Sequence, residues 1–185
     1  DLKNHLPRGY KRNIYSQLIA FAIKTRKLSN GMQAVIDALR LVDEGDPPWF
    51  SINQLYFYLC LRSGEYERAI ELCNRVFNHS RFIKQSDRTR ERWILVRAHL
   101  SWLITVDPQK AGKATLQTFR LNRFLNSVPK FRRDILGFNV AIISIQLLWL
   151  IQKEDYEQAY NRVVNIKRYA SRHLANAAGL MRTYH

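Results

Sequence analysis

The sequence predicts an all-α fold of about four antiparallel helix pairs, and three observations favour it. Apolar residues make up 46% of the 185 residues and aromatic residues 12%, which is enough for a packed core. Glycine and proline are scarce, at 7 and 5 residues, and no sustained alternation of Val, Ile and Thr indicates a strand. Apolar residues instead recur at helical spacing between short runs of turn residues.

Turn residues divide the chain into eight expected helices. The sequence SNG at 29–31 is expected to separate the first two, and DEGDPP to end the second, because paired prolines prevent a helix from continuing. Gly64 is expected to cap the third, and Asp107 with Pro108 to end the fifth and begin the sixth. The helices are expected over 10–28, up to 42, 51–62, about 66–77, 89–106, 108–127, 133–152, and from 155 onwards. They form pairs over about 10–45, 49–79, 89–127 and 133–177, within a single domain over 1–185.

One local pattern recurs at the start of the second helix of a pair. GEYERAIELC at 64–73 and KEDYEQAYNRV at 153–163 share an acidic residue, a tyrosine, and an alanine three positions later. We expect the tyrosine to fill the gap between two antiparallel helices, and the alanine to let them approach closely. A small residue stands early in each second helix, at Ala34, Ala69, Ala114 and Ala159.

These positions resemble the tetratricopeptide repeat (TPR) family, whose unit is a helix–turn–helix of about 34 residues. Gly64, Tyr66 and Ala69 match its turn glycine, tyrosine and alanine, and further matches are Tyr156, Ala159, Ala22 and Ala34. The resemblance implies a right-handed α-solenoid, with a compact helical bundle as the alternative. The chain departs from the pattern at Phe57, where a small residue is usual, and at Arg81, where the final proline is usual.

No motif indicates catalysis. None of the five histidines has zinc-site spacing, and no glycine-rich phosphate loop or serine elbow occurs. We therefore expect no catalytic residue, no metal and no cofactor. Cys60 and Cys73 stand in apolar contexts and are expected to be buried thiols in a reducing, cytoplasmic compartment.

The stretch 135–151 has no charge, but it is short for a bilayer span and polar residues interrupt it, so we expect a buried helix and no membrane partner. The chain begins at Asp1 without a methionine. This start favours a part of a longer protein, with the remainder of the chain or a partner subunit in contact with it.

The net charge of +15, from 30 Lys and Arg against 15 Asp and Glu, favours anionic partners. Residues 108–133 and 158–185 contain basic residues and no acidic ones. A basic stripe on the sixth and eighth helices would be a solvated face, a surface for an acidic protein, or a track for nucleic-acid phosphates. Its residues are Lys110, Lys113, Arg120, Arg123, Arg162, Arg168 and Arg172.

The concave side of a TPR-like array is formed mostly by the first helix of each pair. The resemblance places Arg26, Gln54, Tyr58 and Arg62 there, and helical periodicity in the fifth helix adds Arg92 and His99. Tyr58 and Arg62, one turn apart, suit an extended or acidic peptide, although Tyr58 could instead pack between repeats. We therefore expect a non-enzymatic scaffold that binds a protein or peptide. The alternative is a basic helical-repeat module that binds RNA or DNA through phosphate contacts.

Overall fold

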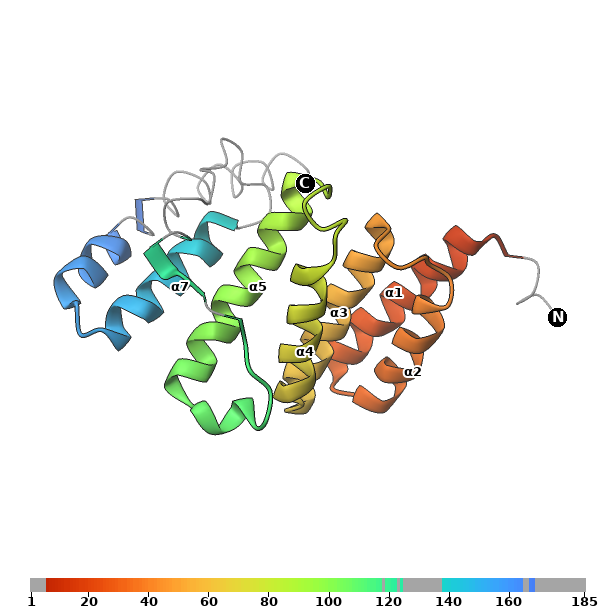
Figure 1. Ribbon diagram of the computed structural model, residues 1–185, viewed down its shortest axis with the longest axis horizontal. Coiled ribbons are helices and arrows are strands. Elements are labelled where there is room, and N and C mark those ends of the chain that lie inside the picture. The colour runs from red at the N-terminus through yellow and green to blue at the C-terminus, as the bar shows by residue number, and fades with distance from the viewer. Residues whose placement is uncertain (1–5, 118, 123, 125–137, 165–166, 169–185) are drawn as a thin grey trace, which may run out of the picture. The chain divides into compact units, whose positions relative to one another are not determined.

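The computed structural model describes residues 6–117, 119–122, 124, 138–164 and 167–168 (Figure 1). Within these residues every regular element is helical, which confirms the all-α fold class. The chain divides into two compact units, Asp1–Phe119 and Arg120–His185, and the expected single domain remains a prediction. The elements are α1 (Arg8–Thr25), α2 (Leu28–Leu39), α3 (Pro47–Ser63), α4 (Tyr66–Asn78), α5 (Asp87–Val106), the 3₁₀ turn η2 (Pro108–Ala111) and α7 (Phe138–Gln152).

In the first unit, α1 to α5 pack side by side in chain order, and α3 is the shared central helix (Figure 1). One face of α3 packs against α1 and α2, in an apolar cluster that contains Ile19, Ala34, Val35, Ala38, Ile52 and Leu59. Its other face packs against α4 and α5, in a larger cluster that includes Phe50, Phe57, Cys60, Ile70, Cys73, Trp93 and Leu100. The burial of both free cysteines confirms that part of the sequence analysis.

A single turn geometry recurs at three places. Arg26, Gly64 and Glu154 each end a helix in the left-handed conformation, with φ of 58°, 77° and 58°. In each case the next residue donates its N–H to the carbonyl five positions earlier: Lys27 to Ala22 (3.1 Å), Glu65 to Cys60 (2.9 Å), and Asp155 to Leu150 (3.0 Å). This is the Schellman arrangement that reverses a chain after a helix. The chain thus repeats a turn, and the solenoid arrangement of its pairs stays a prediction.

The repeated turn corrects the expected register of the first pair. The residue five positions after the left-handed one is buried in all three cases: Gly31, Ala69 and Ala159. Gly31, rather than Ala34, is therefore the small residue of the first pair. A Cβ at Gly31 would lie 2.9 Å from Ala22 Cβ and 2.9 Å from Leu59 Cδ1, so α2 approaches both neighbours closely there. Ala22 and Ala34 are both buried.

Two expected helix boundaries are wrong. The sequence SNG lies inside α2, and the break falls at Arg26, a residue type that rarely adopts a left-handed conformation. Pro47 and Pro48 do not merely end a helix but begin α3, because the first helical positions need no backbone N–H donor. Gly64 caps α3 as expected.

The expected sixth helix is not formed over 112–117. After η2, Gly112 turns the chain with φ of 55°, Lys113 belongs to the same turn, and residues 114–117 form no regular secondary structure. Ala114 is therefore not a helical packing residue, although it lies half-buried against the larger core cluster. Side chains of α4 satisfy the main chain of this segment, as described below, and they replace the hydrogen bonds that a helix would have made.

In the second unit, α7 ends as expected at Gln152, and residues 156–164 are helical. Ala159 is buried, but Tyr156 is 66% exposed and does not fill a gap between helices as expected. The expected helical residues at 125–137 and 169–177 lie outside the described residues. No described helix combines the length and apolar character that crossing a bilayer would require.

Candidate functional site

Two of the residues expected to face a ligand come together between α3 and α5. Tyr58 of α3 lies near Arg92 of α5, and Arg88 is one turn before Arg92. Burial and then the Arg88 cation lower the pKa of Arg92, whereas Tyr58 acts in the opposite direction. Tyr58 is 41% exposed, and Arg62 is exposed one turn further along α3. We call Tyr58, Arg62, Arg88 and Arg92 the cationic–aromatic face.

The other expected ligand-facing residues have different surroundings. Arg26 forms the left-handed turn after α1, and its side chain is exposed there. His99 is half-buried, and its Nδ1 donates to the carbonyl of Leu95 in its own helix at 2.9 Å. Gln54 is half-buried one turn before Tyr58. The sequence analysis missed Arg88, although its position four residues before Arg92 could have identified it.

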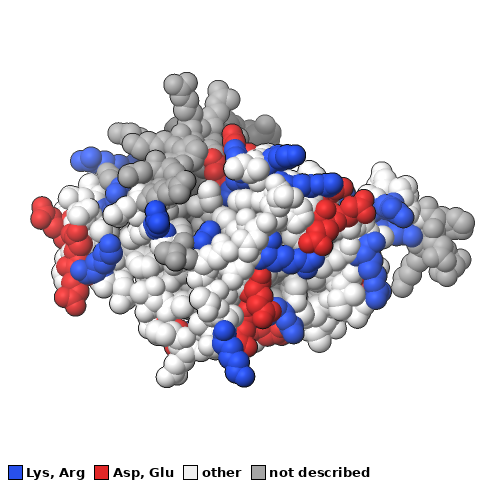
Figure 2. Space-filling view, in the orientation of Figure 1, with Lys and Arg blue, Asp and Glu red and all other residues white. Residues whose placement is uncertain are grey.

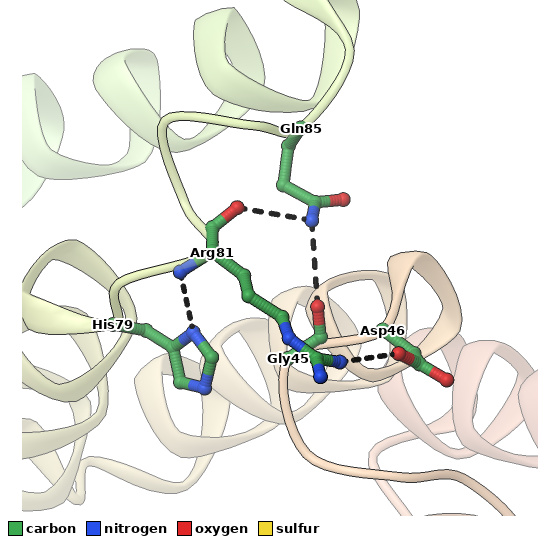
Figure 3. A network of polar contacts seen from close by, with 5 residues as sticks. All are labelled: Gly45, Asp46, His79, Arg81 and Gln85. Atoms are coloured by element: carbon green, nitrogen blue, oxygen red, sulfur yellow. Dashed lines mark hydrogen bonds and ion pairs between the residues drawn. The ribbon is translucent and has the colours of Figure 1, made fainter.

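A polar junction between two loops holds the helices that carry this face (Figure 3). Arg81 pairs with Asp46 at 2.8 Å and donates its backbone N–H to His79 Nδ1 at 3.1 Å. Gln85 donates to the carbonyls of Gly45 (3.4 Å) and Arg81 (3.2 Å). Because these loops immediately precede α3 and α5, the junction fixes the relative positions of the two helix starts. Arg81, which stands in place of the usual repeat proline, is thus a structural residue here.

The expected basic stripe is not a continuous helical surface in the described residues. Lys110 pairs with Asp107 at 3.1 Å and lies over the ring of Tyr66, with 5.5 Å from its Nζ to the ring centroid. Lys113 is exposed in a turn, not on a helix. Figure 2 shows acidic groups interspersed with basic ones on the face that it draws. The remaining members belong to the second unit, where Arg120 and Arg168 are exposed and Arg162 is half-buried; Arg123 and Arg172 lie outside the described residues.

The exposed side of α4 binds the non-helical residues 112–117, which we call the 112–117 segment. Asn74 forms two hydrogen bonds to the main chain of this segment. The Asn74 Nδ2 donates to Thr115 O (2.9 Å), and the Asn74 Oδ1 accepts from Gln117 N–H (3.3 Å). Glu67 accepts from Lys113 N–H at 2.5 Å. The sequence analysis missed Asn74 and Glu67, and because the polar side of an amphipathic helix is ordinarily solvated, it offered no signal for them.

One side of α1 is apolar and exposed. Tyr10, Ile14, Leu18 and Phe21 line an open groove of about 500 Å³ and are 66%, 48%, 48% and 58% exposed. When Arg26 is aligned with Gly64, Ile14 takes the place of Ile52, Leu18 that of Tyr56, and Phe21 that of Leu59. These α3 residues are the ones that pack against the preceding helix pair. The α1 apolar face therefore has the register of a helix-packing surface.

The described residues contain no group of three or more His, Cys, Asp or Glu side chains arranged to hold a metal ion. Burial raises the pKa of both Cys60 and Cys73 to about 12. These thiols are therefore protonated near neutral pH and are poor nucleophiles.

Comparison of the chain with protein-family models, with curated proteins and with solved structures gave no match in any of the three cases.

Proposed function

We propose that this chain is a non-enzymatic scaffold, built from TPR-like repeats, that binds an acidic peptide or protein segment on the cationic–aromatic face. The observation that carries the proposal is that Tyr58 of α3 and Arg92 of α5 lie near enough to interact electrostatically, with Arg88 one turn before Arg92 on the same helix. A half-buried guanidinium stays charged, and it interacts more strongly with a carboxylate than a fully solvated one does. The exposed Tyr58 ring adds apolar contact and a hydroxyl group.

The α1 apolar face supports a second kind of contact, with the remainder of the chain or a partner subunit. A contiguous exposed apolar face of this kind is typical of a protein-interaction surface. The nucleic-acid alternative depends on the basic stripe and on the net charge of +15. The proposed test therefore includes RNA as a competitor.

The test is binding of a labelled Asp- and Glu-rich peptide containing one leucine, measured by fluorescence anisotropy near physiological salt. We expect Arg92→Gln with Tyr58→Ala to weaken binding by about tenfold or more, because a charge-assisted hydrogen bond and an aromatic contact are lost. The control is Lys24→Gln with Lys27→Gln, at exposed positions around the turn between α1 and α2. It removes two positive charges outside the cationic–aromatic face, one more than the test variant removes. Equal losses in both double variants would reject the face as the site. Displacement of the peptide by mixed-sequence RNA, with a steep dependence on salt, would favour the nucleic-acid module instead.

A further inference from the structure

We propose that the exposed side of α4, together with Arg97 of α5, is a binding site for an extended basic peptide, and that the 112–117 segment occupies it within the chain. This site is separate from the cationic–aromatic face and differs in charge. It would take a main chain in strand conformation, with a small residue at the place of Ala114 and an aliphatic residue at that of Leu116.

The central contact is made by Asn74, which hydrogen-bonds to main-chain atoms of the segment and not to its side chains. The two bonds of Asn74 join one amide group to Thr115 O and Gln117 N–H, an acceptor and a donor two residues apart on the same edge. An adjacent β-strand would offer that edge a similar donor and acceptor. A side-chain amide in this position can therefore hold any extended segment that lies along α4.

Further contacts fix both ends of the segment. At the first end, Glu67 accepts from Lys113 N–H. At the other end, Arg97 donates to Gln117 O at 3.1 Å, and the Gln117 side chain donates to Asn78 Oδ1 at 2.7 Å. Glu67, Asn74 and Asn78 lie along one side of α4, about two turns and then one turn apart. These three side chains thus form a row along α4 that runs parallel to the segment.

The side chains of the segment alternate as in a strand. Ala114 and Leu116 are half-buried and pack against the larger core cluster, whereas Lys113, Thr115 and Gln117 are exposed. This alternation gives the site its preference for a small and then an aliphatic residue, two positions apart. The main-chain contacts supply the remainder of the affinity.

The carboxylates of Glu67 and Glu71 at the first end of the site favour a peptide with a basic residue there. A polar groove of about 540 Å³ at that end is lined by Glu65, Glu67 and Glu71, together with Lys110, Gly112 and Arg68, which pairs with Glu65. Lys110 of the chain itself lies in it over the Tyr66 ring. A ligand with a lysine a few residues before its small residue would make the same cation–π contact.

The segment is held by contacts that can open without unfolding the helices. Its hydrogen bonds to Glu67, Asn74, Asn78 and Arg97 are all exposed to solvent, and only two of its side chains are even half-buried. Local opening of such a segment costs far less than global unfolding. While it is bound, however, its high effective concentration, of the order of millimolar, disfavours a competing peptide.

Gly112 is the position at which the segment can be released selectively. Its φ is 55°, and a Cβ there would lie 1.8 Å from Glu67 Oε1. Gly112→Val should therefore displace both the turn and the Glu67 contact, while the helices remain intact. The probe is a labelled peptide with the sequence KAGKATLQ, which is that of residues 110–117.

We expect the full chain with Gly112→Val to bind this peptide at least tenfold more tightly than the unaltered chain does. Adding Asn74→Leu, which keeps the shape of the side chain but removes its amide, should reverse the gain. A control peptide with aspartate in place of the aliphatic residue should bind at least tenfold more weakly. Helical circular dichroism establishes that each variant is folded.

A folded Gly112→Val chain that does not bind the peptide, or that binds it equally well with Asn74→Leu, would overturn the proposal. Hydrogen exchange gives a second measurement that needs no glycine variant. Asn74→Leu alone should speed exchange of the Lys113 and Gln117 amides by at least tenfold and leave the α4 amides unchanged. Unchanged exchange of Gln117 would likewise refute the site. The acidic peptide of the first test should not compete, so the two proposals can fail independently.

Discussion

Ile14 and Ile52 allow the repeat register to be tested by the same substitution at two equivalent positions. Ile52 is 1% exposed between α3 and the preceding pair, whereas Ile14 is 48% exposed on the α1 apolar face. Replacement by alanine removes three carbons in each case. At Ile52 the lost transfer free energy is about 2.4 kcal/mol, at about 0.8 kcal/mol per carbon.

The cavity left at Ile52 adds to this loss, so Ile52→Ala should lower the free energy of unfolding by about 3–4 kcal/mol. The expected fall in Tm is roughly 6–16 °C for a chain of this size. Ile14→Ala should cost below about 1 kcal/mol, because half of its surface is already exposed and alanine has the higher helix propensity.

Urea unfolding, monitored by circular dichroism at several protein concentrations, measures the loss in the free energy of unfolding for each variant. Similar losses for the two variants, independent of protein concentration, would refute the register argument. Losses at Ile14 that grow with protein concentration would instead show that a second copy covers the α1 apolar face.

Three further predictions concern Arg26, the two cysteines and Glu91. Arg26→Gly should raise the free energy of unfolding by about 0.5–1 kcal/mol in urea titrations, because glycine adopts the left-handed turn without strain; a loss would contradict this. Cys60 and Cys73 should not react with a thiol reagent at about pH 8 until the chain is unfolded, because burial raises the pKa of both thiols to about 12. Burial, followed by Asp87, raises the pKa of Glu91, and Arg90 opposes this. The stability that Glu91 contributes is therefore present at acidic pH and lost as the pH rises through its folded-state pKa. Relative to the unaltered chain, Glu91→Gln should be more stable near pH 7 than at about pH 4, and a pH-independent difference in urea titrations would argue against it.

The helical elements were predictable where local signals were strong. Gly64 capped α3 as expected, and α4 and α7 ended within a residue or so of the expected positions. The signals failed where a residue has an unusual backbone conformation. Arg26 takes the role that Gly64 has in the next pair, but an arginine does not indicate a left-handed turn.

The candidate sites were less predictable than the helices. Tyr58 was identified by the resemblance to TPR repeats and Arg92 by helical periodicity, but their proximity across α3 and α5 depends on how those helices pack. Asn74 and Glu67 occupy an ordinary polar side of α4. Their importance arises only because the 112–117 segment lies against them.

The sequence by itself determined the all-α class, the burial of the thiols, and most helix positions, because apolar periodicity and turn residues act within a few positions along the chain. The tertiary structure alone decided that residues 112–117 lie along α4 without forming a helix. Pro108 and a helical apolar pattern favoured a helix there. The side chains of α4 and α5, about forty and twenty residues earlier in the sequence, satisfy the main chain of the segment instead. A long-range hydrogen-bond partner of this kind overrides a modest local helix propensity.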